Sequence, residues 1–141
     1  MEEKAEINFS KQGKKNRSSG TRFEFKVRED LEKDGWFVSK WMNNIDLEKK
    51  KMIPSKRKYN PFMKALSIGT GFPDFIAFKK TEAGFKIMAV EVKANGYLDK
   101  EEKQKAFFYL EQNIFPKILI AKKSKSRGKI DYTDFKEKYT K

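Results

Sequence analysis

The sequence of 141 residues contains neither cysteine nor histidine. Without cysteine, the chain can form no disulfide and no thiolate metal site, and it has no thiol nucleophile. Without histidine, it has no imidazole ligand for zinc, no histidine general base and no Ser-His-Asp triad. Any metal ion that the chain binds must therefore be held by oxygen atoms, and oxygen ligands favour Mg²⁺, Mn²⁺ or Ca²⁺.

Long apolar runs are also missing. No stretch approaches the roughly 20 apolar residues that are needed to span a bilayer. The first four residues, Met1-Glu2-Glu3-Lys4, lack the apolar core of a signal peptide. We therefore expect a cytoplasmic, intracellular protein that has no membrane partner.

Acidic residues are outnumbered by basic ones. The chain has 33 Lys and Arg against 20 Asp and Glu, which gives a net charge of +13. Its 13 Phe, 5 Tyr and 2 Trp are enough for a packed interior, so this is not a disordered polybasic chain. So large a positive excess on a small domain favours a polyanionic partner, above all nucleic acid, over the alternative of a solvated lysine-rich surface.

The length predicts one domain. Residues 1–18 are polar and basic, and we expect a flexible basic arm there. Residues 19–141 form the expected domain, which is interrupted at about 42–71 by a basic segment with two prolines. A structureless loop of this length is unusual in a compact domain, so we expect a functional insertion or short elements within it.

Periodicity and turn signals predict a small α/β domain with a mixed sheet flanked by helices. Thr21 and Glu24 have the spacing of a capping box, Gly35 is placed to end that helix, and Asp99 is placed to cap a later one. The expected elements are a helix from 21 to 34, strands over 36–41, 72–79, 85–93 and 117–121, and helices over 100–113 and 132–139.

The candidate site combines Pro73-Asp74 with Glu91 and Lys93, which lie on the next predicted strand. Side chains alternate along a strand, so Glu91 and Lys93 point to the same face. If the two strands pair as a hairpin, Asp74 and Glu91 converge on one metal ion. Two carboxylates, a backbone carbonyl and waters suit Mg²⁺.

The chemistry that needs this set of groups is hydrolysis of a phosphodiester. A metal ion polarises the phosphate and lowers the pKa of a water, and a nearby ammonium such as that of Lys93 stabilises the added negative charge. The alternative is an ordinary Pro-Asp turn and a solvated Glu-Lys pair. The apolar run around Glu91 argues against it, because charges in such a strand are unfavourable unless they are paired or bind a metal.

These motifs resemble the PD-(D/E)xK nuclease superfamily, which has the restriction-endonuclease-like fold, over roughly residues 18–121. The resemblance implies that Asp74, Glu91 and Lys93 are the catalytic set and that Val92 adds its carbonyl to the metal site. The segment Gly20-Thr21-Arg22-Phe23-Glu24 resembles a motif of archaeal Holliday junction resolvases. It implies that Glu24 joins the metal site, and the alternative is that Glu24 only caps its helix.

Two further positions come from related families. Gly96-Tyr97-Leu98 followed by Gln104 resembles the glutamine motif of virus-type replication-repair nucleases, which implies a catalytic role for Gln104. The alternative is an exposed helix residue. Ser67 is similar to a DNA-binding serine of the resolvases. The insertion at 42–71 is longer than the loop of typical resolvases, which weakens the transfer of their specificity for junctions.

Clustered basic residues are the candidates for contact with DNA phosphates. With Ser67 they form this set: Lys14, Lys15, Arg17, Lys49, Lys50, Lys51, Lys56, Arg57 and Lys58. No helix-turn-helix, zinc finger or RNA-recognition pattern is present, which favours reading of DNA shape over base sequence.

The sequence therefore predicts a Mg²⁺-dependent DNA endonuclease that acts on branched or structured DNA in repair or recombination, with Mn²⁺ as a substitute. The resolvase resemblance implies a homodimer, which would be associated with the nucleoid. Two alternatives stay open. One is a replication-repair, restriction or homing nuclease of other specificity, and the other is a DNA-binding module that kept the fold without the reaction.

Overall fold

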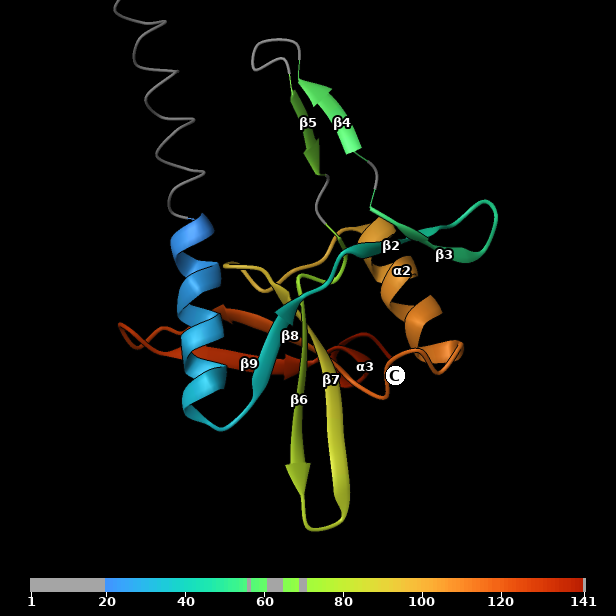
Figure 1. Ribbon diagram of the computed structural model, residues 1–141. Helices are drawn as coiled ribbons and strands as arrows, with labels where there is room; N and C mark the ends of the chain where they lie inside the picture. Colours follow the sequence, from blue (N-terminus) through green and yellow to red (C-terminus); the bar gives the residue numbers. More distant parts are fainter. Residues whose placement is uncertain (1–19, 56, 61–64, 69–70, 141) are drawn as a thin grey trace, which may run out of the picture.

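The computed structural model of the chain describes residues 20–55, 57–60, 65–68 and 71–140, the second and third ranges by their backbone. The expected basic arm at 1–18 lies outside these residues. Within them, the chain is a mixed α/β structure of three helices, a five-stranded sheet and two separate hairpins (Figure 1).

The central sheet has the order β1-β6-β7-β8-β9. Its pairs are antiparallel except β7 and β8, which run parallel, so the expected mixed sheet is confirmed. The helix α2, Lys100–Glu111, connects the two parallel strands. The strands are β1 Phe37–Lys40, β6 Phe75–Thr81, β7 Gly84–Val92, β8 Ile118–Lys123 and β9 Ile130–Asp134.

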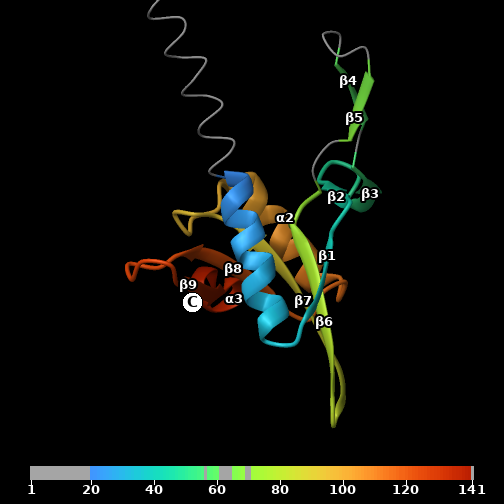
Figure 2. The same cartoon turned by 60° about the vertical axis from the view of Figure 1, so that its left-hand side comes forward.

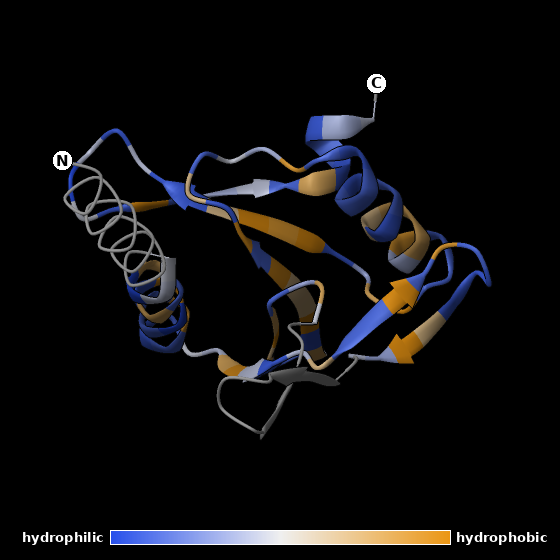
Figure 3. Ribbon diagram, turned by 90° about the horizontal axis from the view of Figure 1, so that it is seen from above, coloured by the Kyte–Doolittle hydropathy of each residue, from blue (hydrophilic) through white to orange (hydrophobic). Residues whose placement is uncertain are grey.

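A helix covers each face of this sheet, as the views in Figures 2 and 3 show. The N-terminal helix, described over residues 20–33, packs its stripe of Phe23, Val27 and Leu31 against Met88 and Val90 of β7. The opposite face carries a second core, in which α2 and α3 (Phe135–Tyr139) pack. Its members include Ala89, Ala106, Tyr109, Phe115, Ile118 and Phe135. Successive side chains of β7 point alternately into the two cores, which is why this strand is apolar on both sides.

In the segment expected to be an insertion, the described residues form two antiparallel hairpins. One pairs β2 (Asn43–Asp46) with β3 (Lys51–Pro54), and the other pairs β4 (Arg57–Asn60) with β5 (Ala65–Ile68). Ile45 of β2 is buried in the core on the α2 side of the sheet, so this hairpin is anchored to the domain. Both hairpins lie at the end of the sheet where β6 begins and β7 ends (Figures 1 and 2).

Three sequence predictions need correction. Residues 20 and 21 are already helical, so Thr21 does not cap the first helix, although Gly35 ends it with a φ of 91°. The strand predicted from residue 72 begins at Phe75. The predicted helix over 132–139 is wrong in its first part, because 130–134 form β9 and only Phe135–Tyr139 are helical.

No helix within residues 20–55, 57–60, 65–68 and 71–140 combines the length and the apolar character that a membrane span needs.

Candidate active site

Asp74 lies directly before β6, at the end of the sheet from which the hairpins extend. It follows Phe72-Pro73, whose peptide bond is cis. Its backbone carbonyl accepts a hydrogen bond from the Trp41 N–H at 3.0 Å. Its side-chain Oδ2 accepts one from the Val92 N–H at 2.8 Å. The Asp74 carboxyl is thus held against the last residue of β7.

Buried contacts fix the turn that precedes Asp74. The hydroxyl of Tyr109, which is fully buried on α2, donates to the Phe72 carbonyl at 2.6 Å and accepts from Trp41 Nε1 at 3.1 Å. Gly71 passes so close to the neighbouring backbone that a Cβ there would lie 2.1 Å from the Trp41 carbonyl oxygen. Only glycine fits this position, so packing fixes the residue that begins the turn before Asp74.

Glu91 meets Asp74 across the hairpin, as the sequence predicts. The register pairs Phe75 with Val90, which sets Asp74 opposite Glu91, and the two side chains are within hydrogen-bond distance. Glu91 is only 4% exposed and is the one buried charged side chain in the described part of the chain. Burial above all, and then the contact with Asp74 and with Glu102, raises the pKa of Glu91 far above 4.5, while the charge of Lys93 opposes the shift.

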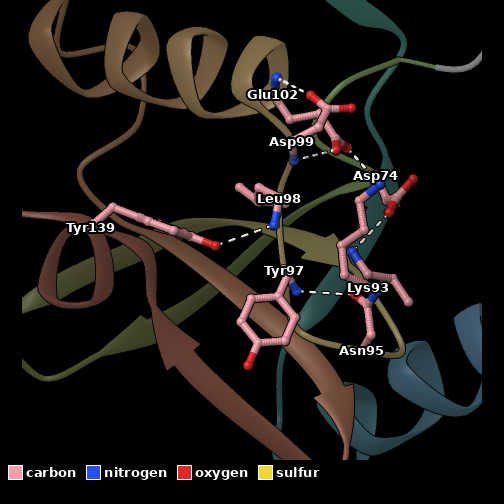
Figure 4. A network of polar contacts seen from close by, with 9 residues as sticks. Asp74, Lys93, Asn95, Tyr97, Leu98, Asp99, Glu102 and Tyr139 are labelled. Atoms are coloured by element: carbon pink, nitrogen blue, oxygen red, sulfur yellow. Dashed lines mark hydrogen bonds and ion pairs between the residues drawn. The ribbon is translucent and has the colours of Figure 1, made fainter.

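Lys93 completes the cluster through an acidic partner that the sequence did not single out. Its Nζ lies 2.6 Å from Glu102 Oε2, in the first turn of α2 (Figure 4). Burial works to lower the pKa of Lys93, but the hydrogen bond and charge of Glu102, with the charges of Glu91 and Asp74, raise it overall. Lys93 is therefore held as an ammonium group.

Glu102 is positioned by a capping box. Asp99 is the N-cap of α2, as predicted, and accepts from the Glu102 N–H at 2.8 Å. In return, Glu102 Oε1 accepts from the Asp99 N–H at 3.1 Å, which leaves Oε2 for Lys93. The Asp-x-x-Glu spacing is the sequence feature from which Glu102 could have been predicted, since a capping box holds its acidic side chain at the start of the helix.

Glu24 faces the same cluster from the N-terminal helix. Partial burial and then the charge of Asp74 raise its pKa, while Lys40 acts in the opposite direction. Thus the structure brings Asp74, Glu91 and Lys93 together at the β6–β7 hairpin, and Glu24 approaches this cluster from the side of Asp74.

The pair of Asp74 and Glu91 fits a divalent cation. Asp74 is half-buried and Glu91 is buried, and two carboxyl groups this close together must share a proton or a cation. Every ligand that they can offer is an oxygen. In a strand, a residue directs its N–H and C=O to the same side, so the Val92 carbonyl faces the Asp74 edge. No group of three or more acidic side chains in the described residues is arranged to hold a metal ion, so water and substrate phosphate would supply the remaining ligands.

The other predicted positions lie apart from this cluster or outside the described side chains. Gln104 is exposed on α2, two residues from Glu102 and hence on the opposite side of the helix. Lys49 and Lys50 in the β2–β3 turn and Lys51 in β3 are exposed. Arg57, Lys58 and Ser67 are described by their backbone only, and Lys14, Lys15, Arg17 and Lys56 lie outside the described residues.

Comparisons with known protein families, with curated proteins and with solved structures found no match to this chain.

Proposed function

We propose that the chain is a metal-dependent endonuclease that hydrolyses phosphodiester bonds in branched or otherwise structured DNA, on a restriction-endonuclease-like fold. The observation that carries the proposal is the contact of the buried Glu91 carboxyl with Asp74 beside the Lys93 ammonium. A buried pair of acids is unfavourable for folding, so its presence favours a functional role. The charge of +13 supports a nucleic-acid substrate.

In this proposal Asp74 and Glu91, with the Val92 carbonyl, would hold Mg²⁺ or Mn²⁺, and Glu24 on the adjoining helix would reach the ion through a bound water. When bound, the ion would polarise the scissile phosphate and lower the pKa of a water. Hydrolysis would balance as attack of a water oxygen on phosphorus while one ester P–O bond breaks, with a proton of the water passing through solvent to the leaving sugar oxygen.

Lys93 has the role of a fixed positive charge. Because its pKa is raised, it keeps its proton and is unsuited to act as a base. Its ammonium instead stabilises the negative charge that grows on the phosphoryl oxygens in the transition state. Glu102 acts through Lys93, because the 2.6 Å ion pair fixes where that ammonium lies. It is a positioning residue.

Two alternatives remain as proposals of lower rank. A nuclease of replication-repair, restriction or homing type would use the same residues on other DNA. A DNA-binding module without activity would not need the buried Glu91 next to Asp74. The resolvase-like function also requires two sites on one substrate, which a homodimer would supply.

The test is cleavage of a panel of labelled DNAs by the purified chain. The panel contains a four-way junction, a flap, single strands and a linear duplex, each with Mg²⁺, Mn²⁺ or EDTA. We expect metal-dependent cleavage of the branched substrates that Asp74→Asn abolishes. Cleavage of the linear duplex at one sequence would favour the restriction or homing type, and binding without cleavage of any substrate would favour the inactive module.

A further inference from the structure

An exposed phenylalanine lies next to Glu24 on the N-terminal helix. Phe25 is 61% exposed, although the same helix buries Phe23 in the core. The helix therefore has one face that packs in the core and another that is exposed. The stripe of Phe23, Val27 and Leu31 holds the helix to the sheet, and Phe25 lies on a second stripe that the core does not use.

This second stripe forms one wall of a hollow of about 190 Å³ beside the acidic cluster. Thr21, Glu24, Phe25 and Arg28, at positions i, i+3, i+4 and i+7, line it from the helix. Lys40 at the end of β1 and Phe75, the residue after Asp74, line it from the sheet. The hollow thus shares Glu24 with the candidate active site and adjoins Asp74 along the chain.

The groups around the hollow suit a nucleotide better than an anion alone. Phe25 offers an exposed ring, and Lys40 offers a cation on the opposite wall. Arg28 is already committed, because its Nε donates to Glu32 at 2.8 Å and its Nη2 to the Val38 carbonyl at 3.1 Å. The Glu24 carboxylate disfavours a free anion in the hollow. A base stacked on the ring, with its phosphate toward Lys40, satisfies both groups.

The size of the hollow agrees with a single base. Sites that enclose a drug-sized ligand measure about 300–1,000 Å³, and the volume of about 190 Å³ lies below that range. A base inside a duplex stacks on its neighbours, so only a base outside the stack can present its face to Phe25.

We propose that Phe25 stacks on an unpaired base adjacent to the phosphodiester that the Asp74–Glu91 site cuts. The site then selects DNA whose strands separate at the cut, such as a fork or the branch point of a junction. This inference rests on the proposed function and adds the feature by which the site recognises its substrate.

The experiment measures binding in EDTA, where no cleavage occurs, by the fluorescence anisotropy of two labelled DNAs. One is a forked duplex with unpaired arms, and the other is a fully paired duplex of the same sequence. The variants are Phe25→Ala, Phe25→Leu and Phe25→Trp. Phe85→Ala is the matched control, because Phe85 is 68% exposed at the far end of β7. Thermal melting of each variant shows that it folds.

We expect Phe25→Ala and Phe25→Leu to weaken binding to the forked DNA about tenfold, and binding to the paired duplex less than about twofold. Phe25→Trp keeps the affinity, because an indole ring stacks at least as well. Loss of affinity for both DNAs alike, or full affinity in Phe25→Leu, would overturn the inference while leaving the nuclease proposal intact. If the wild-type chain binds neither DNA and cleaves none with Mg²⁺, the proposed function itself fails.

Discussion

Titration of Glu91 makes the stability of the metal-free protein depend on pH. Its pKa in the folded state is raised by burial and by Asp74, so the folded chain binds a proton there that the unfolded chain has already lost. The stabilising contribution of the Glu91 proton is therefore fully present below about pH 4.5 and decreases as the pH rises above it, by at most about 1.4 kcal/mol per pH unit. Since the sequence lacks His and Cys, few other groups titrate between pH 6 and 9.

We predict that Glu91→Gln stabilises the metal-free protein at pH 8, because the amide is neutral in both states and folding no longer requires the uptake of a proton at this position. Urea unfolding in EDTA at pH 5 and pH 8 measures this. The wild-type chain should lose stability between the two values and the variant should lose less. Glu82→Gln, at an exposed position, is the control. Equal pH dependence in Glu91→Gln and the wild type would contradict the assignment.

Gly71 gives a second prediction, on the packing that holds Asp74. An added Cβ would lie 2.1 Å from the Trp41 carbonyl oxygen, so the backbone must move. We expect Gly71→Ala to destabilise the protein by about 2–3 kcal/mol. It should also reduce cleavage, because the turn that carries Asp74 shifts. Gly20→Ala is the control, since Gly20 is helical and has open space around it. Gly71→Ala with wild-type stability would refute the close approach.

The sequence predicts the central residues of the site because their geometry is local. Alternation along one strand sets Glu91 and Lys93 on one face, and a hairpin brings Asp74 opposite. Glu102 was not predicted as a site residue, because its contact with Lys93 depends on how α2 packs after the strand ends. Gln104, chosen by resemblance, lies on the opposite side of the same helix.

At the scale of elements, the first turn of α2 controls the charge of Lys93. We predict that Glu102→Gln shifts the alkaline limb of the pH–rate profile to lower pH, because the lost negative charge no longer raises the pKa of Lys93. Glutamine can still accept from the Asp99 N–H, so the helix start is kept. The control is Glu101→Gln, since Glu101 pairs with Lys105 at 3.2 Å on the same helix. An unchanged alkaline limb in Glu102→Gln would exclude the positioning role.

The β4–β5 hairpin is a second element whose expected contribution, to DNA binding, can be tested separately. The Ser55 N–H binds the Met42 carbonyl and the Phe72 N–H binds the Asn43 carbonyl, so the ends of the segment between them lie close together. Replacement of residues 56–70 by Gly-Ser-Gly removes four Lys and Arg and no acidic residue. We expect weaker DNA binding and a smaller slope of log affinity against log salt, by up to about 0.9 per lost phosphate contact.

A charge-only variant provides the matched control for this deletion. Replacing the same four basic residues by Gln keeps the segment and should reduce the salt slope as much as the deletion does. Melting curves establish that both variants fold. A slope equal to that of the wild type in both would show that this hairpin does not contact DNA.

Elements with one clear periodicity were predicted, and those with mixed signals were not. The β6–β7 hairpin follows from two apolar runs with a turn between them, and α2 follows from its cap and its apolar face. The segment at 130–139 has aromatic residues at helical spacing, yet Tyr132 pairs with Ala121 in the sheet and donates to Asp30 of the N-terminal helix at 2.7 Å. Contacts with residues distant in the sequence therefore determine the conformation of this segment, and a local sequence pattern does not reveal such contacts. The hairpins within 42–71 could not be predicted, because prolines and clustered charges interrupt the pattern of apolar residues that indicates strands.

For the whole molecule, the features proposed for function gather at one end of the sheet. The acidic cluster, the start of the N-terminal helix and both hairpins lie where β6 begins and β7 ends (Figure 1). The α/β class and the mixed sheet could be predicted from the sequence. The strand order and the position of the hairpins beside the site could not, because both depend on contacts between distant segments.

We propose that the Asp74–Glu91–Lys93 cluster hydrolyses DNA with a divalent metal ion. The most direct measurement is the single-turnover rate of cleavage of a four-way junction with Mg²⁺, for the wild-type chain, Asp74→Asn, Lys93→Ala and the surface control Glu82→Gln. We predict that the first two variants are slower by at least about 10³-fold, that the control equals the wild type, and that EDTA abolishes cleavage. Cleavage that survives both site substitutions, or a wild-type chain that binds the junction without cutting it, would contradict the claim.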